Sequence, residues 1–242
     1  MQLERILQKH GFGTRKDCRV LVRRGRVSIA GTPCTDPFAD LPTAGLVFAV
    51  DGEEWPCLDL ATVILHKPAG YECSRKPSHY PGVLELLPPP LRLRGLQPIG
   101  RLDQDTTGFL LLTDDGQLNH RLSSARRHVP KVYEIDTAEP VSESQCAQLC
   151  EGVVLHDDPD PVRAAGCVIT GERSLRLTIT EGKYHQVKRM VAAVGNHVLA
   201  LHRSAIGGLS LPADLAPGQW CWLTAADQAR LEGGGQTEGG EA

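Results

Sequence analysis

The residue types that could do chemistry are concentrated in one stretch, GRLDQDTTGFLLLTDDG, from Gly100 to Gly116. Its polar first half leads into the apolar run Phe109 to Leu112, which is too short for a membrane span and is typical of a strand buried on both faces. A polar loop before a buried strand can hold a reactive group rigidly, and Asp103 is our candidate for that group. Spacing alone favours a structural role, however, because Asp103 and Asp105 could each bond the backbone of a turn.

The stretch resembles the GRLD-containing motif of RNA pseudouridine synthases, and GRLDQDTTG with TDDG resembles the branch that acts on small-subunit ribosomal RNA. Further matching segments are KPAGY at Lys67 to Tyr71, KVYEI at Lys131 to Ile135, and EGKYHQVKRMVAAVGNHVLALHR at Glu181 to Arg203. With the N-terminal segment, the resemblance covers almost the whole chain. It implies an α+β protein that isomerises a specific uridine of 16S ribosomal RNA to pseudouridine, without a cofactor or a metal.

The resemblance also implies roles for individual residues. The reaction breaks the bond from ribose to a ring nitrogen of uracil and rejoins the base through ring carbon five, and Asp103 is the expected nucleophile. Tyr133 is expected to stack on the uracil, and its hydroxyl could accept or relay the proton from carbon five. Lys188, at the edge of a predicted buried helical stripe, should pair with Asp103 and favour its carboxylate form. Whether Asp103 attacks the base or the sugar, or acts in an elimination, stays open.

Arg101 stands two residues before Asp103, so an extended chain should point both side chains to the same side. By resemblance, Arg101 could fill the gap that a flipped nucleotide leaves. Phosphate binding is the alternative for this arginine.

Positive charge is segregated at the N-terminus. The chain carries a formal net charge of −3, whereas residues 1–30 hold eight Lys or Arg and two acids, giving +6 there and −9 elsewhere. Helical spacing, a capping box from Thr14 to Asp17, and strand patterns at 27–29 and 46–50 resemble a small S-four-type RNA-binding domain. A solvated basic face is the alternative, but the pitch of the cations could follow phosphates. The expected RNA contacts are Arg15, Lys16, Arg19, Arg23 and Arg26.

We expect three parts: the RNA-binding domain at 1–55, a mixed-sheet pseudouridine synthase domain at 62–231, and a disordered tail at 232–242. The turn-rich, acidic residues 51–61 have the character of a linker. The acidic, proline-broken segment Val153 to Pro161, with Asp157, Asp158 and Asp160, favours a solvated loop over a metal site. The basic loop Arg126 to Lys131 should help the N-terminal domain to read RNA shape.

Composition and segment lengths are those of a globular cytoplasmic protein with reduced cysteines, and no apolar run could span a membrane. We expect a monomer whose partner is 16S ribosomal RNA, free or in a partly assembled small subunit. Three alternatives stay open: a synthase that acts on large-subunit RNA, a non-catalytic RNA-binding assembly factor, and a glycoside hydrolase that uses Asp103 with Asp105.

Overall fold

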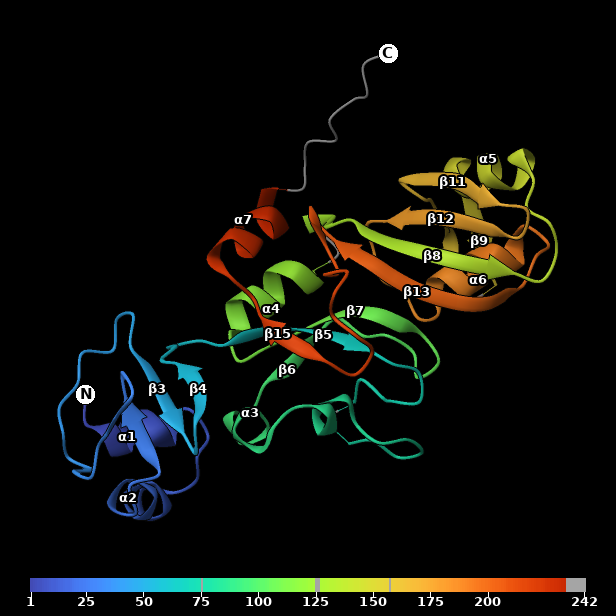
Figure 1. Ribbon diagram of the computed structural model, residues 1–242. Coiled ribbons are helices and arrows are strands. Elements are labelled where there is room, and N and C mark those ends of the chain that lie inside the picture. Colours follow the sequence, from blue (N-terminus) through green and yellow to red (C-terminus); the bar gives the residue numbers. More distant parts are fainter. Residues whose placement is uncertain (75, 125–126, 157, 234–242) are drawn as a thin grey trace. The chain divides into compact units, whose positions relative to one another are not determined.

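A computed structural model of the chain describes residues 1–74, 76–124, 127–156 and 158–233, without the side chains of residues 158, 159, 232 and 233. The chain divides into two compact units (Figure 1). The first is Met1–Ala61 with Leu84–Gln97, and the second is Thr62–Val83 with Pro98–Ala242. No helix in the described part of the chain combines the length and the apolar character that crossing a bilayer requires.

The first unit has a small antiparallel sheet with two helices that precede it in the chain. Its strand order is β2-β1-β3-β4. Thr14 begins the second helix as predicted, since its hydroxyl accepts from the Asp17 amide while the Asp17 carboxylate accepts from the Thr14 amide at 2.9 Å. The elements are α1 (Leu3–Lys9), α2 (Arg15–Arg23), β1 (Val27–Ile29), β2 (Thr32–Pro33), β3 (Val47–Val50), β4 (Glu53–Pro56) and α3 (Pro89–Arg94).

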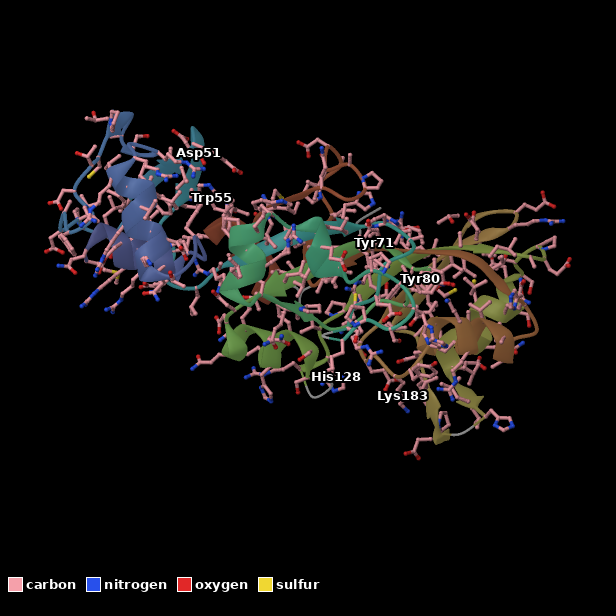
Figure 2. All side chains as sticks on the ribbon, turned by 90° about the horizontal axis from the view of Figure 1, so that it is seen from below. Asp51, Trp55, Tyr71, Tyr80, His128 and Lys183 are labelled. Atoms are coloured by element: carbon pink, nitrogen blue, oxygen red, sulfur yellow. The ribbon has the colours of Figure 1, made fainter. Side chains whose placement is uncertain are left out.

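Residues 51–61 are not simply a linker, because β4 lies within them. Asp51 and Gly52 both have positive φ and close a two-residue hairpin in which Val50 faces Glu53. This hairpin buries Trp55, which is labelled in Figure 2. The Asp-Gly pair was the signal for this turn, and the acidic composition of the segment concealed it.

Helix α3, which the sequence placed in the second domain, groups with the first unit. The Pro90 carbonyl lies so close to Gly11 that a Cβ built on Gly11 would be 1.9 Å from the oxygen. The Arg94 guanidinium donates to the carbonyls of Leu58 and Asp59 at 2.8 and 3.0 Å. Both contacts join segments far apart in the sequence, so residue patterns within α3 could not reveal them.

The second unit is built on a large mixed sheet, which confirms the predicted α+β class. Its strand order is β11-β12-β8-β13-β7-β5-β15, with β14 paired to β13 and β6 paired to β7. Strands β13 and β7 run parallel, and the other pairs on the main path are antiparallel. The strands are β5 (Thr62–Lys67), β6 (Gln97–Ile99), β7 (Thr107–Thr113), β8 (Lys131–Thr137), β11 (Gly166–Gly171), β12 (Ser174–Ile179), β13 (Val198–Ile206), β14 (Leu209–Ser210) and β15 (Trp220–Trp222).

The remaining elements are a second, two-stranded sheet and short helices. The segment Val153 to Pro161 belongs to strands rather than to a loop, because β9 (Val153–Leu155) pairs with β10 (Asp158–Val162) and buries Val153 and Leu155. Asp157, like Arg126 of the predicted basic loop, lies outside the described residues. The helices are η1 (Val83–Leu86), α4 (Gly116–Ser123), α5 (Glu143–Glu151), α6 (Gln186–Ala193) and α7 (Ala225–Gly233). Of the predicted tail 232–242, residues 232 and 233 belong to α7, and residues 234–242 lie outside the described residues.

Strand β7 is the central element for the site. Phe109 to Leu112 are fully buried, as the sequence predicted. The start of β7 approaches β13 closely at Gly108, whose φ is +104° and where an added Cβ would lie 2.3 Å from the Arg203 carbonyl oxygen. The absence of a side chain at Gly108 therefore lets β13 bring Arg203 beside the loop that carries Asp103.

Candidate active site

A buried lysine anchors the loop that carries Asp103. Lys67, at the end of β5, donates to the carbonyls of Pro68, Gln104 and Thr106 at 3.0, 3.1 and 2.8 Å. Burial lowers the pKa of Lys67. Because two of these three carbonyls, those of Gln104 and Thr106, belong to the loop that carries Asp103, Lys67 holds that loop in place, and the Asp103 carboxylate is partly exposed.

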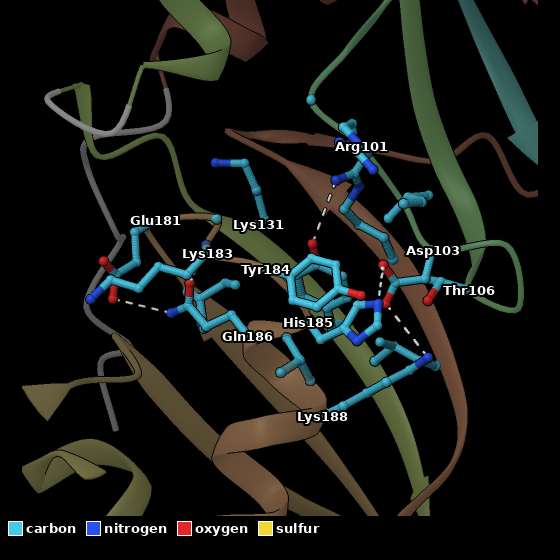
Figure 3. Close-up of a pocket in the computed structure, with 18 of the residues that line it drawn as sticks. Arg101, Asp103, Thr106, Lys131, Glu181, Lys183, Tyr184, His185, Gln186 and Lys188 are labelled. Carbon is cyan, nitrogen blue, oxygen red and sulfur yellow. Dashed lines mark hydrogen bonds and ion pairs between the residues drawn. The ribbon is translucent and has the colours of Figure 1, made fainter. Parts of the chain in front are cut away.

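Two nitrogen-bearing side chains at the N-terminal end of α6 meet the Asp103 carboxylate (Figure 3). His185 Nε2 lies 3.3 Å from Oδ1, and Lys188 Nζ lies 3.5 Å from Oδ2. The predicted pairing of Lys188 with Asp103 is thus present, but it is longer than the contact of His185 with the same carboxylate. Lys188 Nζ lies only 2.7 and 2.8 Å from the two Asp105 oxygens. Burial acts to raise the pKa of Asp105, but the Lys188 hydrogen bond and charge outweigh it, so that pKa lies below its usual value.

A pocket of about 340 Å³ opens beside Asp103. Its walls come from the Gly100–Asp103 loop, β8, the segment 181–185 before α6, and β13. Arg101 and Asp103 both line it, as expected from their spacing. Tyr133 lines it from β8 and is 7% exposed, and Arg203 of β13 lies directly opposite in the strand register.

His185 was missed by the sequence analysis. It precedes α6 with φ of +48°, a left-handed conformation that is uncommon outside glycine. The helix therefore begins at Gln186, and the His185 ring faces Asp103. Tyr184, 71% exposed, stacks on the His185 ring with centroids 3.8 Å apart. An exposed aromatic ring at the rim of a pocket is a surface on which a base could stack.

Lys131, assigned to a loop from the sequence, is the first residue of β8 and lines the pocket. Its ammonium donates to the Val129 carbonyl at 3.0 Å. Burial, together with the charge of Arg203, lowers the pKa of Lys131 to about 8. The lining of the pocket therefore has more Lys and Arg residues than acidic ones, which are Asp103 and Glu181, and this suits a ligand that is or becomes negatively charged.

The predicted RNA-contacting cations of the first unit differ in their surroundings. Arg19 pairs with Glu4, and Arg26, which lies beyond the end of α2, pairs with Asp51 through an Nε to Oδ1 contact of 2.6 Å. Arg15 donates to the Gln8 side chain at 3.3 Å. Lys16 and Arg23 are exposed on α2, and neither side chain makes a hydrogen bond or a close ion pair with another described residue.

Together, a pocket carboxylate flanked by histidine and lysine, a buried tyrosine and an excess of cations form a site for nucleophilic attack on a substrate whose charge becomes negative. The excess of cations and the exposed Tyr184 ring at the rim suit an aromatic ligand that carries or gains negative charge.

Comparison with known proteins identifies that enzyme class. Residues 61–193 match the family model described as RNA pseudouridylate synthase. The chain is 48% identical over 168 residues to ribosomal small subunit pseudouridine synthase A of Escherichia coli K12, covering 69% of this chain and 72% of that protein. It is 36% identical over 231 residues to the protein of the same name from Pasteurella multocida, covering 95% of this chain and 98% of that protein. A solved structure described as a pseudouridylate synthase matches with a TM-score of 0.68 at 34% identity, and the match covers 96% of this chain and 99% of the other.

The chain belongs to the RNA pseudouridylate synthase family, as the motif resemblance predicted. Family membership excludes the glycoside hydrolase and the non-catalytic assembly factor.

Proposed function

We propose that this protein converts one uridine of 16S ribosomal RNA in the small subunit to pseudouridine, with Asp103 as the nucleophile. The observation that carries the proposal is the 48% identity to ribosomal small subunit pseudouridine synthase A, combined with the position of Asp103 at the pocket wall. The match to the Pasteurella multocida protein covers 95% of the chain and therefore extends over both units, which supports the same substrate.

In this proposal, the Asp103 carboxylate attacks the flipped nucleotide while the contacts with His185 and Lys188 orient that carboxylate. Tyr133 packs against the uracil and receives or relays the proton that leaves carbon five. Arg101, exposed at the pocket rim, occupies the space from which the nucleotide flips or binds a phosphate there.

Site selection must come from outside the pocket, because every flipped uridine presents the same base edge. The first unit supplies exposed cations on α2, and folded RNA is distinguished largely by shape and phosphate placement. We therefore assign RNA docking to that unit, acting as part of a monomer, with 16S RNA either free or carrying ribosomal proteins as the substrate.

The test is to map pseudouridine in ribosomal RNA from cells with and without the protein, and to incubate the purified enzyme with each ribosomal RNA. The proposal requires one site in small-subunit RNA to depend on the protein. Modification confined to large-subunit RNA would assign the chain to the other branch of the family, and equal rates on short unstructured oligonucleotides would refute selection by shape.

A further inference from the structure

Arg203 is the most unusual charged residue of the second unit. Its side chain is 1% exposed, although arginine is almost never fully buried without a partner. Its Nε donates to the Phe109 carbonyl at 2.8 Å, and its Nη1 lies 3.5 Å from the Tyr133 hydroxyl, a long contact. Its Nη2 is buried and has no hydrogen-bond partner in the described structure.

The fold uses only part of this guanidinium. The Nε contact joins β13 to β7 and accounts for a structural role, but a neutral donor at that point would do the same. In the described part of the chain no carboxylate pairs with Arg203, and the neighbouring charged residue Lys131 repels it. Leaving a buried charge unpaired is costly, so the arrangement persists where something outside the free protein completes it.

The pocket is where that completion occurs, since Arg203 lines it beside Asp103 and Tyr133. The missing partner must be a hydrogen-bond acceptor, because arginine has no acceptor of its own and five N–H donors. An acceptor that gains negative charge during the reaction would be held more tightly in the transition state than in the ground state.

Uracil in this reaction is such an acceptor by every route open to Asp103. If the carboxylate adds to the base ring, the electron pair of the attacked double bond moves to a carbonyl oxygen. If the carboxylate attacks the sugar, or an elimination occurs, the bond from C1′ to N1 breaks and its electron pair leaves with the base. The detached uracil anion then carries its charge on both carbonyl oxygens until C5 bonds to C1′, the C5 proton leaves and N1 is protonated.

We propose that Arg203 is a catalytic residue whose Nη2 donates to a carbonyl oxygen of the target uracil and stabilises the negative charge of the loosened base. This inference rests on the proposed pseudouridine chemistry but not on the choice of ribosomal RNA. The contact across the strands to the Tyr133 hydroxyl places the same guanidinium where it also orients the group that handles the C5 proton.

Single-turnover kinetics of Arg203→Gln and Arg203→Lys test the proposal on whichever RNA the wild type modifies. Arg203→Gln keeps a donor for the Phe109 carbonyl but removes the charge, and we expect its rate to fall by about 10²–10³-fold with RNA affinity unchanged. Arg203→Lys keeps the charge and should recover part of the rate. The matched control is Arg176→Gln, which removes an exposed arginine that pairs with Glu134 at 2.7 Å outside this pocket. A folded Arg203→Gln within threefold of the wild-type rate would overturn the proposal.

A measurement on the unaltered protein covers the case in which these variants do not fold. Crystals of the wild type soaked with uridine 5′-monophosphate should place a uracil oxygen within about 3.2 Å of Arg203 Nη2. A base whose oxygens are turned away from Nη2, or a pocket that stays empty, contradicts the inference. If the wild type modifies only large-subunit RNA, the proposed substrate fails while the test of Arg203 proceeds on that RNA.

Discussion

Asp103 and Asp105 are separated by one residue, and their partners determine which of them can react. Both Asp105 oxygens are held within 2.8 Å of the Lys188 ammonium. The Asp103 oxygens have looser contacts, at 3.3 Å to His185 and 3.5 Å to Lys188. Asp103 is also the one of the two that lines the pocket. The structure thus separates an anchoring aspartate from an available one, a distinction that spacing alone could not make.

Asp103→Asn should fold and bind RNA but make no pseudouridine, because the amide keeps the size of the side chain and removes the nucleophile. Tritium release from RNA labelled at uridine C5 measures the reaction. Asp136→Asn, an exposed change on β8, is the matched control and should have the wild-type rate. Turnover by Asp103→Asn above a hundredth of that rate would end the nucleophile hypothesis.

A double-mutant cycle of Asp105→Asn and Lys188→Met should reveal how Lys188 acts. If Lys188 serves Asp103 directly, Asp105→Asn costs less than about tenfold in rate, whereas Lys188→Met costs at least about a hundredfold. We expect this result, since the ammonium freed from Asp105 still has Asp103 beside it at 3.5 Å. Equal losses in both single variants, without a further loss in the double variant, would instead assign Lys188 to anchoring the loop.

Lys131 makes the stability of the protein depend on pH in a defined direction. Its folded-state pKa of about 8 lies below the ordinary 10.5, so between these values the unfolded chain binds a proton that the folded chain lacks. Lys131 should therefore contribute a rise in stability with pH through this window, and Lys131→Met should lack that contribution. Thermal unfolding at pH 7 and pH 10 should show the difference in Tm between the two proteins shift in favour of the wild type. Lys16→Met, at an exposed position on α2, should show no such shift.

The catalytic candidates Asp103, Tyr133 and Lys188 were named from motif resemblance, and the structure brings all three around one pocket. Arg203 and His185 were not assigned roles. The contact of His185 with Asp103 depends on a positive φ at His185, which the neighbouring residues in the sequence do not predict. That of Arg203 depends on the register between β13 and β8, which is set by pairing across distant segments.

At the scale of elements, the sequence predicts those with an unbroken apolar run or a helix cap, but it does not predict short strands that contain few apolar residues. Strand β7 and helix α2 follow from an unbroken apolar run and a capping box. Strands β4 and β10 are short and rich in acids or proline, and they exist because a neighbouring strand pairs with them. Such elements carry little local signal, since their stability comes from partners rather than from propensity.

Gly108→Ala tests whether the close approach of β7 to β13 is essential. The φ of +104° is unfavourable for alanine, and the new Cβ would lie 2.3 Å from a backbone oxygen that has no rotamer to change. We expect a loss of about 3 kcal/mol or more in the free energy of unfolding, measured by denaturant titration.

The matched control for this change is Gly218→Ala in the same unit. Gly218 has a similar φ of +84° but open space around the added Cβ, so only the backbone cost of about 1–2 kcal/mol is expected. Equal losses at the two glycines would show that β7 and β13 can separate slightly without consequence.

At the scale of the whole molecule, a net charge of −3 coexists with a cationic N-terminal segment, and RNA binding must depend on the cations that remain available. Deleting the first unit is a poor test, because α3, from a later part of the chain, bonds to residues 58 and 59 of that unit. Single charge removals are sharper, since the structure divides the cations into paired and unpaired sets.

Lys16→Gln and Arg23→Gln should each lower the salt dependence of RNA binding, because both side chains are exposed on α2 and make no hydrogen bond or close ion pair with another described residue. Removing one contact to a phosphate reduces the slope of log Kd against log salt by about 0.7–0.9. Arg26→Gln should lower the slope by less than half of that amount, since the Arg26 guanidinium already donates to both Asp51 oxygens, from Nε at 2.6 Å and from Nη2. Fluorescence-anisotropy titrations of one RNA at several salt concentrations measure the slopes. The same slope change for all three variants would mean that Arg26 leaves Asp51 on binding, and no change for Lys16 and Arg23 would mean that α2 docks something other than RNA.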